Sequence, residues 1–307
     1  MQYVRQQLTE FITSNLTDIY NDWNPSTTYT VQADNALTSA SVVRYGAYYY
    51  RSVTTGNLNF NPLEYENIKW VKYAVSNKYA MLDMSSGSKS EKIGGNIVVT
   101  FLQNQAEVIG VGNYEADNIL VEILASNGTT VVWSYTTPSV INANVIDYYS
   151  YIYEPYQLNQ DFTTKINLPI SGTYIRMTFN ALTLTGNSSC GYLIVGKPIN
   201  MGKSLMGVKF GYSSFTTKEL SSFGNLEIKK GAIQDIVDFE TVISSSYLPQ
   251  MRKELKKIYD DILLFIVDER DDSNYENLMT LGVIQDASVL LENHVESMMT
   301  FSIIEAV

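Results

Sequence analysis

The sequence predicts a mainly β protein with an α+β C-terminal part. Short runs of β-branched and aromatic residues, separated by turn residues, cover most of the chain up to about residue 198, a pattern typical of antiparallel sheets. Tyrosine occurs 23 times in 307 residues, and its large apolar face with a polar tip suits strands and interfaces. We expect four successive parts: an N-terminal helix (1–22), a small aromatic β module (23–75), an antiparallel, jelly-roll-like β-sandwich (76–198) and an α+β domain with one main helix (199–307).

The N-terminal segment is predicted to form a short amphipathic helix. Its apolar residues recur at spacings of three and four, as one face of a helix requires. Such a stripe needs a surface to lie against, and packing on its own module is favoured over a partner chain. The stripe consists of Val4, Leu8, Phe11, Ile12, Leu16 and Ile19.

The aromatic module begins and ends on tryptophan and contains three consecutive tyrosines. "TYTVQA", "ASVVRYG" and "AYYYRSV" are strand-like, with Gly46 in the turn between the last two. Strand alternation puts Tyr48 and Tyr50 on one side and Tyr49 on the other, so at least one side must pack inward. The candidates for contact with a glycan or a partner are Trp23, Tyr29, Tyr48, Tyr50 and Trp70.

The middle of the chain has many short strand-like runs and no helical pattern between them. "NIVVTFLQ", "EVIGVGNY" and "NILVEILAS" are examples, and "SNGTT" between two further runs is a hairpin signal. This spacing favours a β-sandwich or jelly roll.

The last third combines strand-like runs with one helix. Serines precede the helix and can cap it, and Pro249 fits its first turn. "LLFIVDE" is a predicted buried strand, and two further strand-like runs close the chain. The helical face comprises Leu248, Met251, Leu255, Ile258 and Ile262.

Composition argues against several classes of function. The net charge is −11, from 21 basic and 32 acidic residues, whereas a protein that grips phosphate backbones normally carries the opposite sign. We therefore expect no nucleic acid as main partner. Cys190 is the single cysteine, so no intramolecular disulfide can form. No apolar run approaches the roughly 20 residues of a membrane span, and the N-terminus lacks the apolar stretch of a signal peptide.

Residues for catalysis are scarce, and we expect no enzyme, no cofactor and no metal site. His294 is the single histidine, and its surroundings hold no nucleophile motif. The "GVG" at 110–112 lacks the third glycine of a dinucleotide loop. The acidic run 268–274 lacks the spacing and the glycine of an EF-hand. A glycan-degrading enzyme would need two carboxylates roughly 5 to 9 Å apart, and the sequence nominates no such pair.

The aromatic module resembles small chitin- and cellulose-binding modules with the pattern W…Y…V…Y-G-x-x-Y…N…P…W. In that family some of these aromatic residues form the core and only a few bind sugar. The segment after Tyr29 departs from the family's "Y-x-x-G-D" step, which favours a scaffolding role over sugar contact. The matching residues are Trp23, Tyr29, Val43, Tyr45, Gly46, Tyr49, Asn61, Pro62 and Trp70.

Most of the chain after residue 23 is similar to a family of tailed-bacteriophage virion proteins. The likeness lies in residues 70–91, 149–156 and 190–231. It implies a structural tail or neck subunit, made in the host cytoplasm, that forms a homo-oligomeric ring and docks neighbouring tail proteins or fibres. The matching residues include Trp70, Asn77, Lys78, Ala80, Met81, Leu82, Asp83, Gly191, Leu193, Gly196, Gly202, Gly207, Phe210, Gly211, Ser213, Lys218, Glu219, Phe223, Gly224 and Asn225.

Two alternatives stay open beside this assembly role. A receptor-binding tail protein that binds host-surface glycans predicts a flat row of exposed aromatic rings, including Tyr48 or Tyr50. The assembly role predicts instead that these rings are buried against another chain. A glycan-degrading enzyme is the second alternative.

Overall fold

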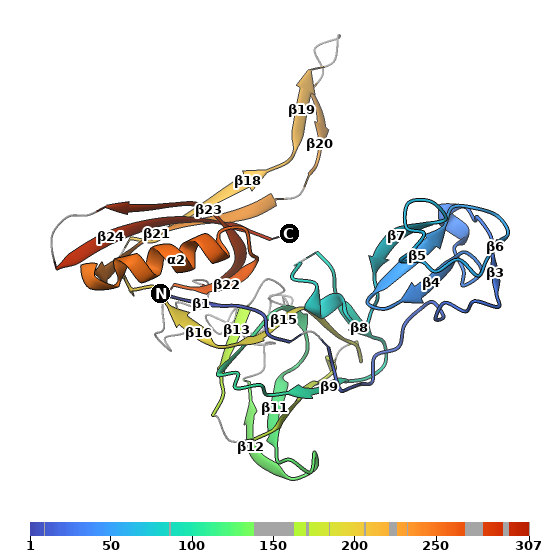
Figure 1. Ribbon diagram of the computed structural model, residues 1–307, viewed down its shortest axis with the longest axis horizontal. Helices are drawn as coiled ribbons and strands as arrows, with labels where there is room; N and C mark the ends of the chain where they lie inside the picture. The colour runs from blue at the N-terminus through green and yellow to red at the C-terminus, as the bar shows by residue number, and fades with distance from the viewer. Residues whose placement is uncertain are drawn as a thin grey trace, which may run out of the picture.

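The computed structural model shows a mainly β protein with an α+β part at the C-terminus, as predicted (Figure 1). A central sandwich lies between a small aromatic module and a helix-bearing sheet. His294, residues 149–156 and the acidic run 268–274 lie outside the described residues. The structure describes residues 1–8, 10–85, 87–137, 163–169, 172–183, 185–205, 207–220, 226–231, 233–267, 279–290 and 295–306.

The aromatic module consists of a three-stranded sheet and a two-stranded ribbon. The sheet has the order β4-β5-β7, and β3 pairs with β6. The turn between β4 and β5 contains Gly46, whose φ of 62° confirms the predicted glycine turn. The strands are β3 (Thr28–Tyr29), β4 (Val42–Tyr45), β5 (Tyr48–Ser52), β6 (Asn57–Leu58) and β7 (Trp70–Val75), with the short helix η1 (Asp34–Ala36) between β3 and β4.

The central body is an antiparallel sandwich of a four-stranded sheet, β13-β10-β15-β8, and a five-stranded sheet, β12-β11-β14-β9-β2. Inward residues of both sheets form one buried core. The predicted hairpin at "SNGTT" joins β11 to β12. The elements are β2 (Thr13–Ser14), η2 (Ala80–Leu82), β8 (Ser90–Lys92), β9 (Ile97–Leu102), β10 (Val108–Glu115), β11 (Ile119–Leu124), β12 (Val131–Thr136), β13 (Thr163–Asn167), β14 (Tyr174–Phe179) and β15 (Ser188–Gly196).

The third body is an eight-stranded sheet with a helix on one face. Its order is β16-β1-β22-β23-β24-β21-β17, and β18 also pairs with β21. Beyond this sheet the hairpin of β19 and β20 projects away from the molecule (Figure 1). The elements are β1 (Gln2–Val4), β16 (Pro198–Asn200), β17 (Lys203–Ser204), β18 (Lys209–Ser214), β19 (Thr217–Leu220), β20 (Leu226–Lys229), β21 (Ile233–Ser244), η4 (Ser245–Tyr247), α2 (Leu248–Ile258), β22 (Leu263–Ile266), β23 (Met279–Leu290) and β24 (Glu296–Glu305).

Helix α2 confirms the predicted helix, with two corrections. Met251, Leu255 and Ile258 are buried against the sheet, and Pro249 lies in the first turn. Ile262 lies beyond the end of the helix. The predicted serine cap is wrong, because Tyr247 occupies the N-cap and makes no side-chain hydrogen bond there.

The predicted N-terminal helix is also wrong. The described residues of 1–22 form two short strands joined by irregular chain, with β1 lying between β16 and β22 and with β2 paired to β9. Leu8, Phe11 and Leu16 enter the sandwich core, whereas Ile12 and Ile19 are exposed by 51% and 78%. The segment does not form the helix that its apolar spacing predicts, because its backbone hydrogen bonds are made with strands β16, β22 and β9 from distant parts of the chain.

Candidate functional site

Three of the five nominated aromatic residues form the core of the aromatic module. Trp70, Tyr29 and Tyr50 are at most 3% exposed and pack around Val43. The rings of Tyr29 and Trp70 meet edge to face at 5.2 Å, and the Trp70 indole N–H donates to the carbonyl of Phe60 at 2.8 Å. Burial removes these three side chains from contact with a glycan or a partner.

The other two nominated residues lie at the rim of this core. Trp23 and Tyr48 are half-buried. The ammonium of Lys72 lies 3.2 Å from the centroid of the Tyr48 ring, a cation–π contact. Trp23 meets Tyr45 at 79° between ring planes. The glycan-binding alternative predicts a flat row of exposed rings that includes Tyr48 or Tyr50, but Tyr50 is buried and Trp23 meets Tyr45 edge to face.

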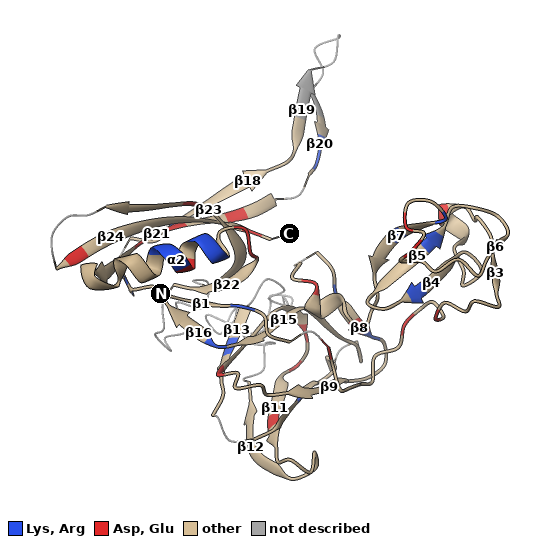
Figure 2. Cartoon of the chain, viewed as in Figure 1, with Lys and Arg blue, Asp and Glu red and all other residues tan. Residues whose placement is uncertain are grey.

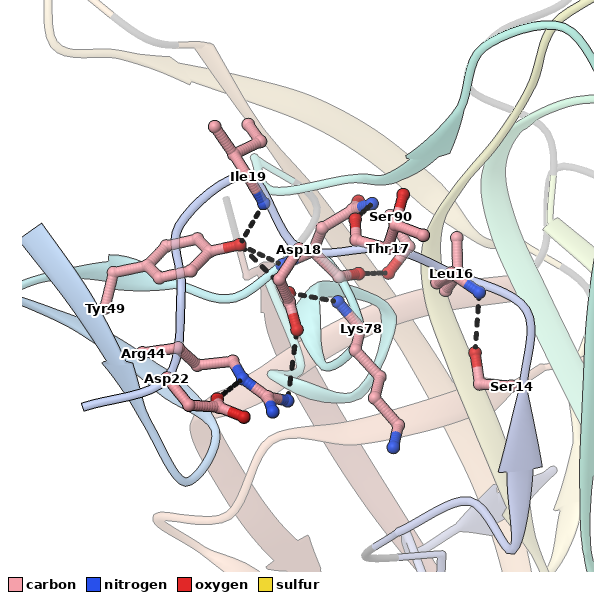
Figure 3. Close-up of polar contacts among 11 residues, drawn as sticks. Ser14, Leu16, Thr17, Asp18, Ile19, Asp22, Arg44, Tyr49, Lys78 and Ser90 are labelled. Carbon is pink, nitrogen blue, oxygen red and sulfur yellow. Dashed lines mark hydrogen bonds and ion pairs between the residues drawn. The ribbon is translucent and has the colours of Figure 1, made fainter. Parts of the chain in front are cut away.

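Tyr49 faces the opposite way and attaches the module to the N-terminal segment (Figure 3). Its hydroxyl donates to the Asp18 carboxylate at 2.9 Å and accepts from the backbone N–H of Ile19 at 3.2 Å. The Tyr20 ring contacts the Tyr49 ring edge to face at 5.1 Å. Burial raises the pKa of Tyr49, so the hydroxyl stays a proton donor to Asp18 at neutral pH.

Arg44 extends the same contact from β4. Its guanidinium lies 3.1 Å from the second carboxylate oxygen of Asp18 and donates through Nε to Asp22 at 2.6 Å. The hydrogen bond from Arg44 holds the pKa of the Asp22 carboxyl below its ordinary value. The Asp18 side chain is only 11% exposed, so these bonds operate largely away from solvent.

Asn77 joins the N-terminal segment to the sandwich. Its amide donates to the carbonyl of Thr17 at 3.0 Å and to the carbonyl of Glu91 at 2.8 Å. It also accepts from the N–H of Glu91 at 2.7 Å. We call Asp18, Arg44, Tyr49 and Asn77 the module junction. Sequence reasoning missed Asp18, because no local pattern links it to Arg44 and Tyr49, which lie 26 and 31 residues further along the chain.

A second surface of note is the ribbon that projects from the C-terminal sheet. On β18, Phe210 and Tyr212 are exposed by 51% and 76%. Ile233 on β21 is exposed by 60% and pairs with Ser214 of β18. Because side chains two residues apart on a strand point to the same face, Phe210, Tyr212 and Ser214 share one face, and Ile233 lies on it too. Phe215 and Ile228 farther along are also more than half exposed. We call these five residues the arm surface. The sequence pattern showed strands here but gave no indication that they leave the body of the protein.

The sandwich carries an aromatic pair on its edge strand β12. Trp133 and Tyr135 have nearly parallel rings, with 12° between planes and 6.1 Å between centroids. Tyr135 is 42% exposed and Trp133 is half-buried. Sequence reasoning did not nominate this pair, because only the sheet order shows that β12 is an edge.

Cys190 and the "GVG" stretch at 110–112 both lie in the packed interior. No group of three or more His, Cys, Asp or Glu side chains in the described part of the chain could hold a metal ion. Cys190 is fully buried, and burial raises the pKa of its thiol. In the "GVG" stretch, a Cβ on Gly110 would overlap Leu264 and a Cβ on Gly112 would overlap the Tyr192 ring. These glycines permit close packing. Among the described helices, none has the length and apolar character of a membrane span.

Comparison with known proteins gives little further information. No protein-family model matches the chain, and no curated protein matches it. One solved structure is similar over a limited region: CBM32-1 from a family 31 glycoside hydrolase of Clostridium perfringens. It has 13% sequence identity and a TM-score of 0.25, and the match covers 39% of this chain and 83% of that one. A likeness this weak carries no argument about function, and none of the comparisons links the chain to a tailed-phage family.

Proposed function

We propose that this protein is an assembly subunit without catalytic activity, and that it forms a ring in the tail or neck of a tailed-phage virion. The arm surface carries this proposal. An isolated two-stranded ribbon is marginally stable in water, and contiguous exposed apolar residues mark interaction sites. Phe210 and Tyr212 are exposed at alternate positions of β18, an edge strand paired with β21 that leads into the projecting hairpin of β19 and β20 (Figure 1). A partner that covers them would stabilise the ribbon.

The residues that carry the virion-protein resemblance have structural roles, which supports the assembly reading. A Cβ on Gly196 would overlap the carbonyl oxygen of Arg5, so this glycine lets the N-terminal segment lie on β15. A Cβ on Gly191 would come within 2.7 Å of Asn113 on the adjacent strand. Asn77 belongs to the module junction.

The N-terminal segment gives the protein the rigidity that a docking platform needs. Gln6 bonds the backbone of β15 through both side-chain atoms, donating to Leu193 at 2.6 Å and accepting from Val195 at 2.9 Å. The same segment adds β1 to the C-terminal sheet and places Asp18 at the aromatic module. We propose that the module, held in this way, presents Trp23 and Tyr48 to neighbouring tail proteins or fibres.

The test is whether the full chain self-associates through its arm. Sedimentation velocity over a concentration series should show oligomers for the unmodified protein and a shift to monomer for Phe210→Ser/Tyr212→Ser. Ile93→Ser is the control, because Ile93 is 86% exposed but lies between β8 and β9 of the sandwich, away from both the arm and α2. Electron microscopy of the oligomer should then show rings. A monomer at every concentration, or an arm variant that associates normally, would contradict the proposal.

Glycan binding is the second candidate, favoured by the Trp133–Tyr135 pair. Pyranose rings stack their C–H faces on exposed aromatic rings, and the 42% exposed Tyr135 ring beside the half-buried Trp133 ring offers such a surface. This candidate places the contact on the sandwich rather than on the aromatic module.

A further inference from the structure

The C-terminal sheet has two faces of different character. On one face, Phe239, Phe301 and Ile303 pack with Met251 and Leu255 of α2. Among the described residues, the other face is covered where the sandwich meets β1, β22 and the start of β23, through residues such as Val4, Leu264 and Leu281. Farther along, over β21, β24 and the rest of β23, this second face is left partly exposed. We call this part the open face.

The open face combines carboxylates with an apolar row. Asp238, Ser302 and Asp286 are cross-strand neighbours on β21, β24 and β23, and Glu240 lies two residues along β21 on the same face. Within the described part of the chain, none of these three carboxylates has an ion-pair partner.

The next row of the open face is apolar. It consists of Val242, Met298 and Leu290, with Leu290 exposed by 56%. Glu296 lies on the same face, and Lys203 and Lys209 lie at its β17 and β18 edge.

Helix α2 presents the opposite charge on the far side of the sheet. Arg252, Lys253, Lys256 and Lys257 are all exposed. Lys257 pairs with Glu254 at 2.7 Å, whereas the other three have no ion pair among the described residues. Figure 2 shows this basic helix beside strands that carry acidic positions. In a chain of net charge −11, four basic side chains within six residues are a local exception.

We infer that α2 of one copy of this chain docks on the open face of the next copy. The inference rests on the proposed assembly function and adds a second contact between copies beside the arm surface. Lys253 and Lys256 would meet the carboxylates of Glu240 and Asp286, and the apolar row beside them would lose its exposure to water. The contact is heterologous, because the two surfaces lie on opposite faces of one sheet. When the same contact is repeated, each further copy is related to the last by the same rotation. The copies then form a closed ring or an open filament.

Charge reversal with complementary mixing tests this contact in the full chain. The helix variant is Lys253→Glu/Lys256→Glu, and the face variant is Glu240→Lys/Asp286→Lys. In sedimentation velocity, each variant alone should need a concentration about tenfold higher than the unmodified protein needs to form oligomers. An equimolar mixture should regain association. The acidic helix of the helix variant can then dock on the basic face of the face variant, and the basic helix of the face variant can dock on the acidic face of the helix variant. Lys165→Glu on the sandwich is the control and should associate normally, and circular dichroism verifies that every variant is folded.

The outcomes separate this inference from the proposed function. If both variants associate normally while Phe210→Ser/Tyr212→Ser does not, assembly stands and the α2 contact is overturned. If both variants dissociate and the mixture fails to associate, the pairing of α2 with the open face is likewise overturned. If the unmodified chain stays monomeric at every concentration, both proposals are overturned.

Discussion

The hydroxyl of Tyr49 donates a 2.9 Å hydrogen bond to the carboxylate of Asp18, and this bond joins the aromatic module to the N-terminal segment. The three consecutive tyrosines thus have three different roles. Tyr49 attaches the module, Tyr50 belongs to its buried core, and Tyr48 lies at the rim beneath the ammonium of Lys72. Strand alternation produces this division, because Tyr49 points to the side opposite its two neighbours.

Replacing Asp18 should loosen the aromatic module without unfolding the sandwich. Asp18→Ala leaves the Tyr49 hydroxyl and the Arg44 guanidinium without their shared acceptor. Losing partners in a largely buried site costs about 1–3 kcal/mol. Hydrogen exchange should therefore accelerate at the backbone N–H of Ile19 and of Lys78, which bond Tyr49 and Asp18 respectively. Small-angle scattering should show a larger radius of gyration.

Asp34→Ala is the control for Asp18→Ala. Asp34 also pairs with an arginine, Arg51, but its side chain is 86% exposed. An exposed pair of this kind contributes little, roughly 0–1 kcal/mol, so exchange at the module junction should not change. Equal exchange in the two variants would show that Asp18 does not hold the module in place.

The fold was predictable where local pattern and tertiary structure agree. Helix α2 could be recognised from its apolar stripe and Pro249, and the alternation of Tyr48, Tyr49 and Tyr50 follows from strand geometry. The N-terminal segment was not predictable in this way. Its strand β1 pairs with β16 and β22, about 200 and 260 residues away along the chain, and spacing within residues 1–22 contains no information about such partners.

The candidate site was only partly predictable, for a related reason. An aromatic residue can serve a core or a surface, and sequence type alone does not distinguish Trp70 from Trp23. The arm surface and the Trp133–Tyr135 pair depend on which strands are edges or projections. That property belongs to the sheet order, which the local sequence does not determine.

Truncating the buried tryptophan should unfold the aromatic module. Trp70 is fully buried, and Trp70→Ala should destabilise the module by about 3–5 kcal/mol through lost packing and the cavity left behind. Tyr48→Ala at the half-buried rim should cost much less. Thermal denaturation followed by tryptophan fluorescence can compare the two variants. A similar loss of stability in both would mean that Tyr48 belongs to the core rather than to an accessible rim.

A glycan array with paired variants should place any sugar contact. If the second candidate function holds, Trp133→Ala/Tyr135→Ala abolishes binding and Trp23→Ala/Tyr48→Ala leaves it intact. The rings of the first pair are nearly parallel, whereas Trp23 meets Tyr45 edge to face. The reverse result would place the sugar contact on the aromatic module. An unmodified protein that binds no glycan on the array would count against this candidate and leave the assembly proposal unaffected.

Alkaline pH should destabilise the sandwich through Tyr192. Burial raises the pKa of Tyr192 to about 12 from 10.0, and its hydroxyl is hydrogen-bonded to Thr163. Because the unfolded chain releases this proton first, the stabilising effect is complete below pH 10.0 and is lost as the pH rises toward about 12. The loss is on the order of 3 kcal/mol. Urea unfolding at a series of alkaline pH values should show this decline, and Tyr192→Phe should make it shallower. An unchanged slope in Tyr192→Phe would assign the decline to other tyrosines.

Gly110→Ala should weaken the contact between the sandwich and the C-terminal sheet. A Cβ at this position would overlap the Leu264 side chain, which packs with Val108 and Ile194 of the sandwich. Forcing an added methyl into packed surroundings costs about 1–3 kcal/mol. Gly95→Ala is the matched control, because its Cβ would lie 3.6 Å from the flexible Lys92 side chain. Calorimetry of Gly110→Ala, Leu264→Ala and the double variant measures the coupling directly. If the overlap is the cause, the double variant loses less stability than the two single losses added together, whereas simple additivity would place the effect of Gly110→Ala elsewhere in the sandwich.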